Sequence, residues 1–538
     1  MNDVCIYDTT LRDGAQQEGI SLSVADKVNA LGILDELGVD IVEGGWPGAI
    51  PKDTEFFARA RDITLKHARL AAFGSTTKAG VPAADDPQVA ALHESGAPII
   101  TLVAKSDPRH VERALRTTLD ENLRMVRDTV QYLTANGHEV MLDLEHYFDG
   151  LTADPQYGID VAIEAARAGA TAVVMCDTNG GNLPDGIAAV TRRTIQALAD
   201  AGFPDTQVGI HTHNDTGCAV ANALASIQAG ATQVQGCING YGERTGNANL
   251  LTCIANLQIK EGIEVVTPEA LATLTSVSKR FSELVNIPPF TRDPYVGKSA
   301  FAHKAGLHAS AIRVDPDLYQ HIDPAVVGSD MRMLVSEMAG RSSIELKARE
   351  MGIDLSQHPG MDKRVAAIVK EKEAEGYMYD AADASFELLL RRAMGMLPEY
   401  ALVESWKTET GELRQADGSI RPSSEATIKI HTSKRRIRTA EGNGPVNALD
   451  RALRHALRPD YRMVNEFHLT DFRVRIVDES RAGTDAVIRV LVTIEDGERS
   501  WSTVGIGTDV IEASWEALVE GYWWGLAASG VESVYPGE

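Results

Sequence analysis

Two histidines and an aspartate form the clearest chemical pattern in this sequence. His211 and His213 are two residues apart in "VGIHTH", and an extended backbone would place both imidazoles on one face. Two neighbouring imidazoles suit a divalent metal ion, and a carboxylate from another strand end would complete the ligand set. Asp13, in "DTTLRDGAQ", is the best-placed carboxylate, and Asn247 could add a neutral oxygen. The pattern predicts a metal site, with a hydrogen-bonded polar rim as the alternative.

Arg12 stands directly before the candidate ligand Asp13 and indicates what the metal would act on. A guanidinium beside a metal ion is unfavourable unless an anion lies between them. A 2-oxo acid fits, because its carboxylate and ketone oxygens would chelate the metal while Arg12 stabilised the charge that grows on the ketone oxygen. The alternative is a structural salt bridge from Arg12 to Asp8 or Glu43.

The elements that position these residues are short apolar runs that alternate with helical patterns through the first half of the chain. Strands are predicted over residues 4–7, 40–45, 70–74, 99–104, 140–145, 171–176, 208–213 and 232–237. Eight strands that alternate with helices predict an α/β fold, a (β/α)8 TIM barrel. A doubly wound sheet would need a glycine-rich phosphate turn after its first strand, where this chain has "LRDG".

Functional groups in such a barrel gather at the carboxyl ends of the strands. Besides Arg12 and Asp13, the predicted ends carry Glu43, Glu145 and Thr178. The histidines of "HTHND" end the seventh strand, and the segment "NGYGERTGNAN" follows the eighth. We therefore expect all of these groups to share one rim of the barrel.

The remainder of the chain predicts two further parts. The barrel is expected over 1–265, followed by helical linker subdomains over 266–400. From 401 to 538, "EATIKIHT", "DFRVRIVD", "DAVIRVLVTIED" and "SWSTVGIG" alternate apolar and polar residues as half-buried strands do, and two amphipathic helices accompany them. We expect an α+β domain there, with a regulatory or dimer-forming role.

A second pair of histidines, His303 and His308, lies in the linker segment "SAFAHKAGLHASAI". They are five residues apart, so one helical face would not present both as ligands. One of them could instead act as a general base near neutral pH, and a purely structural role is the alternative.

Composition restricts the partners of this chain. A net charge of −24, from 52 Lys+Arg against 76 Asp+Glu, repels nucleic acid and anionic membranes. The first residues do not have the pattern of a signal peptide, and no apolar run approaches the roughly 18 residues of a membrane span. The five cysteines have no C-x-x-C spacing and are expected to be buried thiols. We expect a cytoplasmic protein without nucleic-acid or membrane partners.

The motifs "DTTLRDGAQ", "HTHND" and "GYGERTGNAN" together resemble the alpha-isopropylmalate synthase and homocitrate synthase family, and the resemblance covers essentially the whole chain. It implies a metal-dependent barrel enzyme that condenses acetyl-CoA with a 2-oxo acid. Within the family, "EGGWPGAIPKD", "FGSTTKAG", "EHYFDG" and "SAFAHKAGLH" look like the citramalate synthases, whose acceptor is pyruvate. The isopropylmalate synthases are expected to carry Gln-Asp where this chain has Ala309 and Ser310.

The resemblance also implies roles for individual residues. Asp13, His211 and His213 would bind the metal, with Asn247 near or in its shell; zinc or manganese is favoured and magnesium is possible. Arg12 would polarise the ketone, Thr178 would hold the substrate carboxylate, and Glu145 would assist proton transfer. Glu43 is a further substrate-binding candidate. His308, more than His303, would be the base, reaching the partner subunit's barrel in a domain-exchanged homodimer, and Tyr319 would lie near the acyl-CoA site.

The C-terminal part resembles the family's allosteric domain, so we expect feedback inhibition by isoleucine, the end product of a threonine-independent route. Three alternatives remain at this point. A 2-isopropylmalate synthase would differ only in taking 2-oxoisovalerate. A 3-hydroxy-3-methylglutaryl-CoA lyase would run related chemistry in the direction of cleavage. A non-catalytic amino-acid-binding regulator would retain the barrel without its metal.

Overall fold

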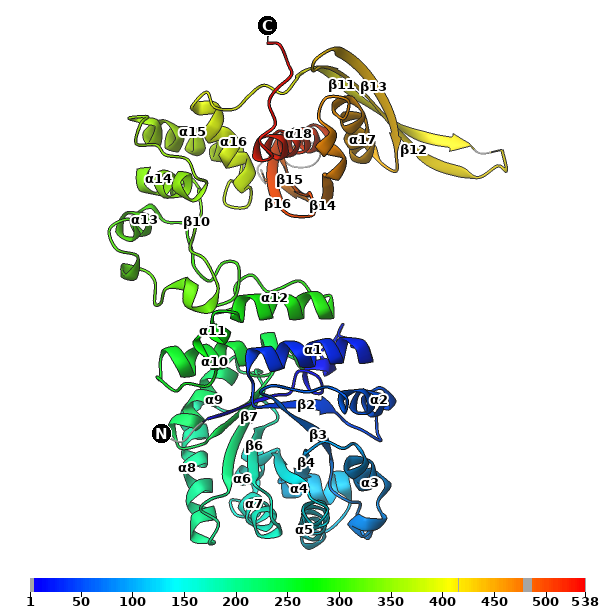
Figure 1. Ribbon diagram of the computed structural model, residues 1–538, viewed down its shortest axis with the longest axis vertical. Coiled ribbons are helices and arrows are strands. Elements are labelled where there is room, and N and C mark those ends of the chain that lie inside the picture. The colour runs from blue at the N-terminus through cyan, green and yellow to red at the C-terminus, as the bar shows by residue number, and fades with distance from the viewer. Residues whose placement is uncertain (1–3, 415, 478–485, 538) are drawn as a thin grey trace. The chain divides into compact units, whose positions relative to one another are not determined.

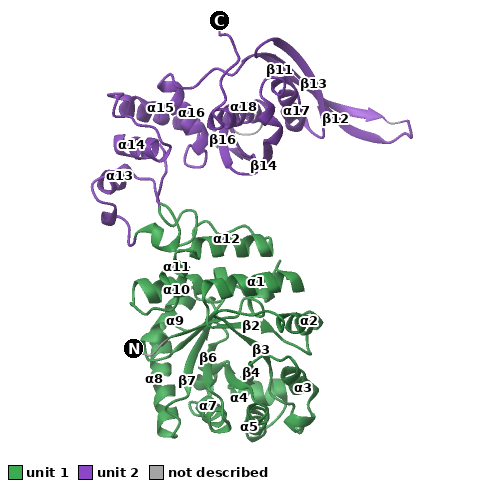
Figure 2. Cartoon of the chain, viewed as in Figure 1, with its two compact units in different colours: residues 1–301, 323–330 green, residues 302–322, 331–538 purple. Residues whose placement is uncertain are grey.

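The computed structural model describes residues 4–414, 416–477 and 486–537 (Figure 1). The chain divides into two compact units, residues 1–301 with 323–330 and residues 302–322 with 331–538 (Figure 2). The borders predicted at residues 265 and 400 stay predictions.

The first unit contains a closed barrel of eight parallel strands in sequence order, in which β1 also pairs with β8. The strands are β1 (Cys5–Asp8), β2 (Ile41–Gly45), β3 (Arg69–Ser75), β4 (Ile99–Lys105), β5 (Glu139–Glu145), β6 (Ala172–Asp177), β7 (Gln207–Thr212) and β8 (Gln233–Gly236). The predicted TIM barrel is confirmed, and each predicted strand border lies within one residue of the observed one.

Helices follow the strands and cover the outside of the barrel (Figure 1). They are α1 (Val24–Leu37), α2 (Pro51–Ala60), α3 (Pro87–Glu94), α4 (Pro108–His110), α5 (Leu119–Ala135), α6 (Tyr147–Ala153), α7 (Tyr157–Ala168), α8 (Pro184–Asp200), α9 (Ala219–Gln228), α10 (Leu250–Ile259), α11 (Pro268–Leu271) and α12 (Leu274–Val285). Local sequence fixes their ends. Ser23 and Asp26 form a reciprocal cap at the start of α1, worth about 1 kcal/mol, and Gly38 ends α1 with a φ of 84°.

The barrel interior changes from apolar to polar along the strands. One residue from each of β1 to β6 contributes to a buried layer, namely Tyr7, Ile41, Ala71, Ile99, Met141 and Ala172. Two residues further along β2, β4 and β5, on the same face, lie the buried polar residues Glu43, Thr101 and Asp143. Tyr7 joins the two levels, because its hydroxyl lies 2.9 Å from Glu43 Oε1 and 2.7 Å from Thr101 Oγ1. The polar groups are thus held by rigid strands.

The second unit begins with small helical and irregular elements around their own apolar cluster. Its first elements are β9 (Ala302–His303), α13 (Gly306–Ile312), β10 (Arg332–Met333), α14 (Arg341–Glu350), α15 (Met361–Glu375) and α16 (Asp383–Ala393). β9 and β10 form a short parallel pair, which the sequence pattern did not indicate.

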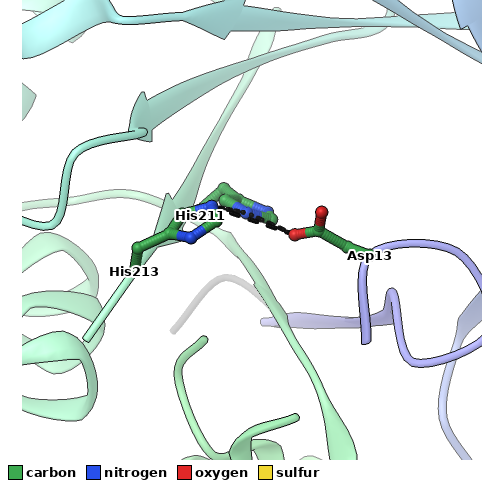
Figure 3. Close-up of side chains that lie close together, drawn as sticks. All are labelled: Asp13, His211 and His213. Carbon is green, nitrogen blue, oxygen red and sulfur yellow. Dashed lines mark hydrogen bonds and ion pairs between the residues drawn. The ribbon is translucent and has the colours of Figure 1, made fainter. Parts of the chain in front are cut away.

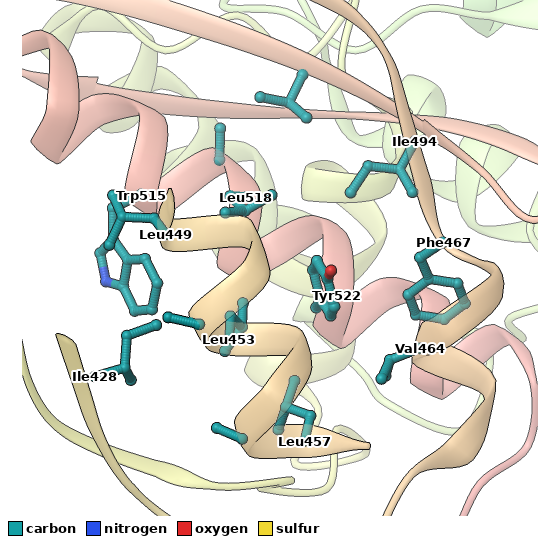
Figure 4. Close-up of a cluster of buried hydrophobic side chains, with 14 of the residues drawn as sticks. Ile428, Leu449, Leu453, Leu457, Val464, Phe467, Ile494, Trp515, Leu518 and Tyr522 are labelled. Carbon is teal, nitrogen blue, oxygen red and sulfur yellow. The ribbon is translucent and has the colours of Figure 1, made fainter. Parts of the chain in front are cut away.

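The C-terminal part of the second unit contains two three-stranded antiparallel sheets and two long helices. Its elements are β11 (Leu402–Arg414), β12 (Ile420–His431), β13 (Arg435–Gly442), α17 (Pro445–Leu457), β14 (His468–Ile476), β15 (Ile488–Glu495), β16 (Ser500–Gly507) and α18 (Val510–Ala528). α17 and α18 pack against each other and against the sheets around the core shown in Figure 4, where Leu453, Leu518 and Tyr522 are buried. The predicted α+β character is confirmed.

Some details differ from the expectations. β11 and β13 were not predicted, because both are largely exposed and charged and so lack an apolar period. The predicted strands 471–478 and 485–496 match β14 and β15, while residues 478 and 485 lie outside the described residues. Of the cysteines, Cys176, Cys237 and Cys253 are buried, but Cys5 and Cys218 are only half-buried. Among the described helices, none has the length and apolar character needed to cross a lipid bilayer.

Candidate active site

Asp13, His211 and His213 converge at the carboxyl end of the barrel (Figure 3). Asp13 Oδ2 lies 3.2 Å from His211 Nε2 and 3.9 Å from His213 Nε2, and the two Nε2 atoms are 3.2 Å apart. All three residues are buried. They meet because β7 and β1 both pair with β8, and because the two-residue spacing turns both imidazoles to the same face.

The donor set fits a divalent metal ion. Gln235 donates its amide nitrogen to Asp143 Oδ1 at 3.0 Å, so its oxygen accepts from His211 Nδ1 at 2.9 Å. With Nδ1 paired to Gln235, His211 Nε2 is the ring nitrogen that faces His213 and Asp13. Ligands about 2.0–2.2 Å from one metal ion are separated from each other by roughly 3–3.5 Å, close to the distances observed here.

Electrostatics keeps two of these groups ready to coordinate. Burial opposes ionisation of Asp13, but the charge of Arg12 and the contact with His211 outweigh it and hold the pKa of Asp13 well below its usual range. Burial, together with the charge of His211, lowers the pKa of His213 to about 3. Near neutral pH, Asp13 is therefore a carboxylate and His213 a neutral imidazole, the forms that bind metals.

Asn247 lies beside the cluster, and its amide nitrogen donates to Asp13 Oδ2 at 2.5 Å. Its oxygen is buried and has no hydrogen-bond partner among the described residues. That oxygen packs so closely against Gly242 that a Cβ there would lie 2.1 Å from it. In this arrangement Asn247 holds Asp13 in place, and its amide group would have to turn for its oxygen, which lies against Gly242, to reach a metal ion in the cluster.

Arg12 is anchored on both sides. Its Nε donates to Glu43 Oε2 at 2.5 Å, its Nη1 donates to Asp13 Oδ1 at 2.9 Å, and its guanidinium lies 3.8 Å from the Phe73 ring centre. The salt bridge to Glu43 is therefore present, whereas Asp8 instead accepts hydrogen bonds from Thr10. Glu43 is fully buried and does not line the adjoining cavity, and among the described residues its carboxylate accepts hydrogen bonds from Arg12 and Tyr7. Arg12 itself does line the cavity.

A cavity of about 610 Å³ brings most of the predicted site residues together. Arg12, Asp13, His211 and His213 line it with Glu145 and Thr178, and Trp46 and Phe73 supply an apolar wall. Thr178 Oγ1 accepts the His146 backbone N–H at 2.8 Å, which leaves its hydroxyl proton for another acceptor. Glu145 forms an ion pair with Lys105.

The remaining predicted residues, His303, His308 and Tyr319, belong to the second unit. The His308 ring stacks on Tyr319 with centres 4.1 Å apart, and the centre of the His303 ring lies 6.2 Å from that of His308. Burial and the charge of His308 lower the pKa of His303. The barrel unit therefore contains Arg12 and the candidate metal-binding cluster of Asp13, His211 and His213, but not the histidines predicted as base.

Residues 3–280 match the family model described as HMGL-like. The chain belongs to the HMGL-like family. Residues 295–375 match the homocitrate synthase post-HMGL domain-like model, and residues 380–523 match the LeuA allosteric (dimerisation) domain.

Curated relatives extend this family membership over nearly the whole chain. An (R)-citramalate synthase of Streptomyces coelicolor is 56% identical over 98% of this chain and 97% of that protein. An (R)-citramalate synthase of a Synechocystis species is 47% identical over 97% and 96%. A probable 2-isopropylmalate synthase of Methanopyrus kandleri is 32% identical over 96% and 97%. Among solved structures, hydroxymethylglutaryl-CoA lyase from Pseudomonas aeruginosa matches with a TM-score of 0.45 and 23% identity, covering 53% of this chain and 94% of that one.

Several residues of this HMGL-like site were missed by the sequence analysis. Lys105 ends β4 and lines the cavity, but the predicted strand stopped at residue 104. Asp143 lines the cavity two residues before Glu145 on the same face of β5, and burial with the charge of Glu43 raises its pKa to about 7. The rule that functional groups gather at strand ends indicates Lys105, and the alternation of faces along a strand indicates Asp143, because it lies two residues before Glu145. No sequence pattern indicates Gln235, because its role depends on its contacts with His211 and Asp143 across the barrel.

Proposed function

We propose that this chain is an (R)-citramalate synthase, which condenses acetyl-CoA with pyruvate and hydrolyses the resulting thioester to (R)-citramalate and CoA. One observation carries the proposal: the buried Asp13, His211 and His213 cluster shares a cavity with Arg12, whose Nη1 lies 2.9 Å from Asp13 Oδ1. The identity of 56% to the Streptomyces coelicolor protein supports the choice of reaction.

Asp13, His211 and His213 would hold a divalent metal ion, for which zinc or manganese is favoured over magnesium by the two imidazoles. When bound, the ion would supply Lewis-acid polarisation of the 2-oxo acid. The chain's own groups orient the substrate. The Thr178 hydroxyl donates to the pyruvate carboxylate, and the Arg12 guanidinium donates to the ketone oxygen, where negative charge develops during attack.

The acyl donor must lose a proton from its acetyl methyl group. His308 of the linker takes this proton, serving the barrel of the partner subunit in a homodimer, and Glu145 with Lys105 relays protons at the cavity wall. The carbanion equivalent attacks the ketone carbon and forms the new C–C bond, while Arg12 compensates the charge on oxygen, which is then protonated. Water cleaves the thioester, so that acetyl-CoA, pyruvate and water give citramalate and CoA.

The reaction is tested by CoA release, followed with a thiol reagent, from acetyl-CoA and a panel of 2-oxo acids, before and after chelation. Release that is faster with pyruvate than with 2-oxoisovalerate and is lost on chelation supports citramalate synthesis. Preference for 2-oxoisovalerate would instead indicate a 2-isopropylmalate synthase, the activity named for the relative that is 32% identical. No release with any acceptor would refute both.

We also propose that the C-terminal part mediates dimerisation and feedback inhibition by isoleucine, in a cytoplasmic enzyme of isoleucine biosynthesis. The match of residues 380–523 to an allosteric (dimerisation) domain supports this role. Light scattering should give twice the chain mass of 58.0 kDa. Calorimetric titration should detect heat with isoleucine, and the absence of heat with isoleucine, leucine and valine alike would count against the regulatory role.

A further inference from the structure

The cavity beside the metal cluster is much larger than a 2-oxo acid requires. Six non-hydrogen atoms need on the order of 100 Å³ if each takes somewhat less than the roughly 30 Å³ that a water occupies, whereas the cavity measures about 610 Å³. Most of its volume is therefore left for the acyl donor. That the remaining volume holds an acyl donor rests on the function proposed above.

The cavity crosses the mouth of the barrel. The Asp13, His211 and His213 cluster lies at the ends of β1 and β7, while Ser75, the last residue of β3, the following residues Thr76 to Ala79, and Leu115, after β4, line the same cavity. Since the eight strands follow one another in sequence order around the barrel, β3 and β4 lie opposite β7 and β8. A ligand with one end at the metal cluster would therefore extend toward the loops that follow β3 and β4.

Three cations stand on these loops without a counterion. Lys78, Arg113 and Arg116 are exposed, and their side chains form no hydrogen bond or ion pair with any described residue. Lys78 lines the cavity itself, and the two arginines flank the lining residue Leu115. The only acidic side chain among residues 109–118 is Glu112, which is also exposed.

Neighbouring cations differ in this respect. Arg109 forms an ion pair with Asp107, and Arg124 forms ion pairs with Glu121 and Asp128.

The backbone that carries Arg113 and Arg116 has a defined shape. Residues Val111–Leu115 form a π-helical turn, and Arg116 ends it with a φ of 56°, in the left-handed region that non-glycine residues rarely adopt. Irregular turns of this kind are concentrated at functional sites, where the surrounding structure maintains them.

These features match the charge distribution of a coenzyme A thioester. Such a molecule has its reactive acyl group at one end and a 3′-phosphate and a diphosphate at the other, with about four negative charges in total. A chain with a net charge of −24 repels such a polyanion unless cations are gathered where it enters. The barrel unit has a second cavity of about 760 Å³ near Asn214 and Phe290, but no described residue that lines it is lysine or arginine, and Asp293 is among them.

We propose that Lys78, Arg113 and Arg116 bind the phosphate groups of the coenzyme A thioester at the mouth of the barrel, with Leu115 packing against the adjoining arm. The acyl group then lies at the metal end of the same cavity, next to Arg12. The cations contribute to capture of the acyl donor and not to recognition of the 2-oxo acid.

The test compares donors that share the acetyl thioester but differ in phosphate content: acetyl-CoA, acetyl-dephospho-CoA and S-acetylpantetheine. In an R113A/R116A double variant, the KM for acetyl-CoA should rise by about 10- to 100-fold, as expected for the loss of two charge-assisted contacts. The KM for S-acetylpantetheine and that for pyruvate should change less than twofold. The matched control K66A/R192A removes two exposed cations from the loop before β3 and from α8, and should leave the KM for acetyl-CoA at the wild-type value.

Two results would overturn the proposal: an unchanged KM for acetyl-CoA in the double variant, or an equal rise for S-acetylpantetheine. Calorimetric titration with CoA itself needs no turnover, so it separates this proposal from failure of the condensation reaction. Wild-type protein should bind CoA at least tenfold more tightly than R113A/R116A does. Adenosine 3′,5′-bisphosphate should compete with CoA; if inorganic phosphate competes equally well, the loops form a general anion site and the assignment to coenzyme A is wrong.

Discussion

Gln235 tests how the candidate metal-binding cluster is held in place, because it forms a hydrogen bond with the proposed ligand His211 but is not itself a proposed ligand. It is fully buried, accepts from His211 Nδ1 at 2.9 Å and donates to Asp143 Oδ1 at 3.0 Å. Replacement by leucine removes both hydrogen bonds and leaves two buried polar groups unpaired. The outer partners of metal-bound histidines typically contribute 10- to 100-fold to metal affinity, or about 1.4–2.7 kcal/mol. We expect Gln235→Leu to weaken metal binding by that factor.

The matched control is Gln233→Leu, one layer deeper on the same face of β8. Gln233 is also fully buried, but its amide group lies against the sulfur atoms of Met141, at 3.5 Å, and Cys5, and its oxygen has no hydrogen-bond partner among the described residues. This control should therefore retain wild-type metal affinity and lose little stability.

The assay strips each protein of metal and titrates it with Zn²⁺ or Mn²⁺ against a competing chromogenic chelator at pH 7.5. Urea unfolding of the metal-free proteins checks that each variant is folded, with a loss of about 1–3 kcal/mol expected for Gln235→Leu. A folded Gln235→Leu protein with wild-type affinity would refute the role given to Gln235. Equal weakening in both variants would show that the effect is not specific to His211.

Three further outcomes are expected. Arg12→Lys should lower kcat by about 100-fold, because lysine cannot span Glu43 and Asp13 as the guanidinium fork does; a change in KM for pyruvate alone would contradict the role in charge stabilisation. Thr178→Val should raise the KM for pyruvate by about tenfold or more while Thr178→Ser stays near wild type, and equal effects of the two would exclude the hydroxyl. Burial raises the pKa of Asp8 to about 7, so the native state holds a proton that the unfolded state releases above about pH 4; wild-type stability then falls as pH rises from 4 to 7, by at most about 1.4 kcal/mol per pH unit. The free energy of unfolding of Asp8→Asn, measured by urea titration, should lack that decline. A difference in unfolding free energy between the two proteins that stays constant with pH would refute the raised pKa of Asp8.

The sequence predicted the scaffold well, because the barrel depends on local patterns. Apolar runs separated by helical periodicity locate all eight strands, and the strand-end rule then brings Asp13, His211 and His213 to one rim. The proximity of His211 and His213 follows from the two-residue period of a strand alone. The proximity of Asp13 to them also requires that the barrel close between β1 and β8, which the count of eight strands implies.

Side-chain contacts inside the barrel were harder to predict from the sequence. Gln235 and Asp143 are 92 residues apart, and their hydrogen bond depends on the registers of β5 and β8 in the closed barrel. The same holds for Glu43, which its strand-end position made a substrate-binding candidate but whose side chain points under Arg12 and not into the cavity. β11 and β13 were missed for another reason: charged side chains on both faces hide the strand period, and pairing with β12 on either side forms the sheet.

The most direct test of the central claim follows metal content and turnover together. Metal-free wild-type protein and Asp13→Ala are titrated with Mn²⁺ while CoA release from acetyl-CoA and pyruvate is measured at each step. The account predicts that the wild-type rate rises linearly with bound metal and reaches a plateau at one ion per chain, while folded Asp13→Ala shows neither tight binding nor turnover. Turnover that is independent of bound metal, or a near-normal rate in Asp13→Ala, would contradict it.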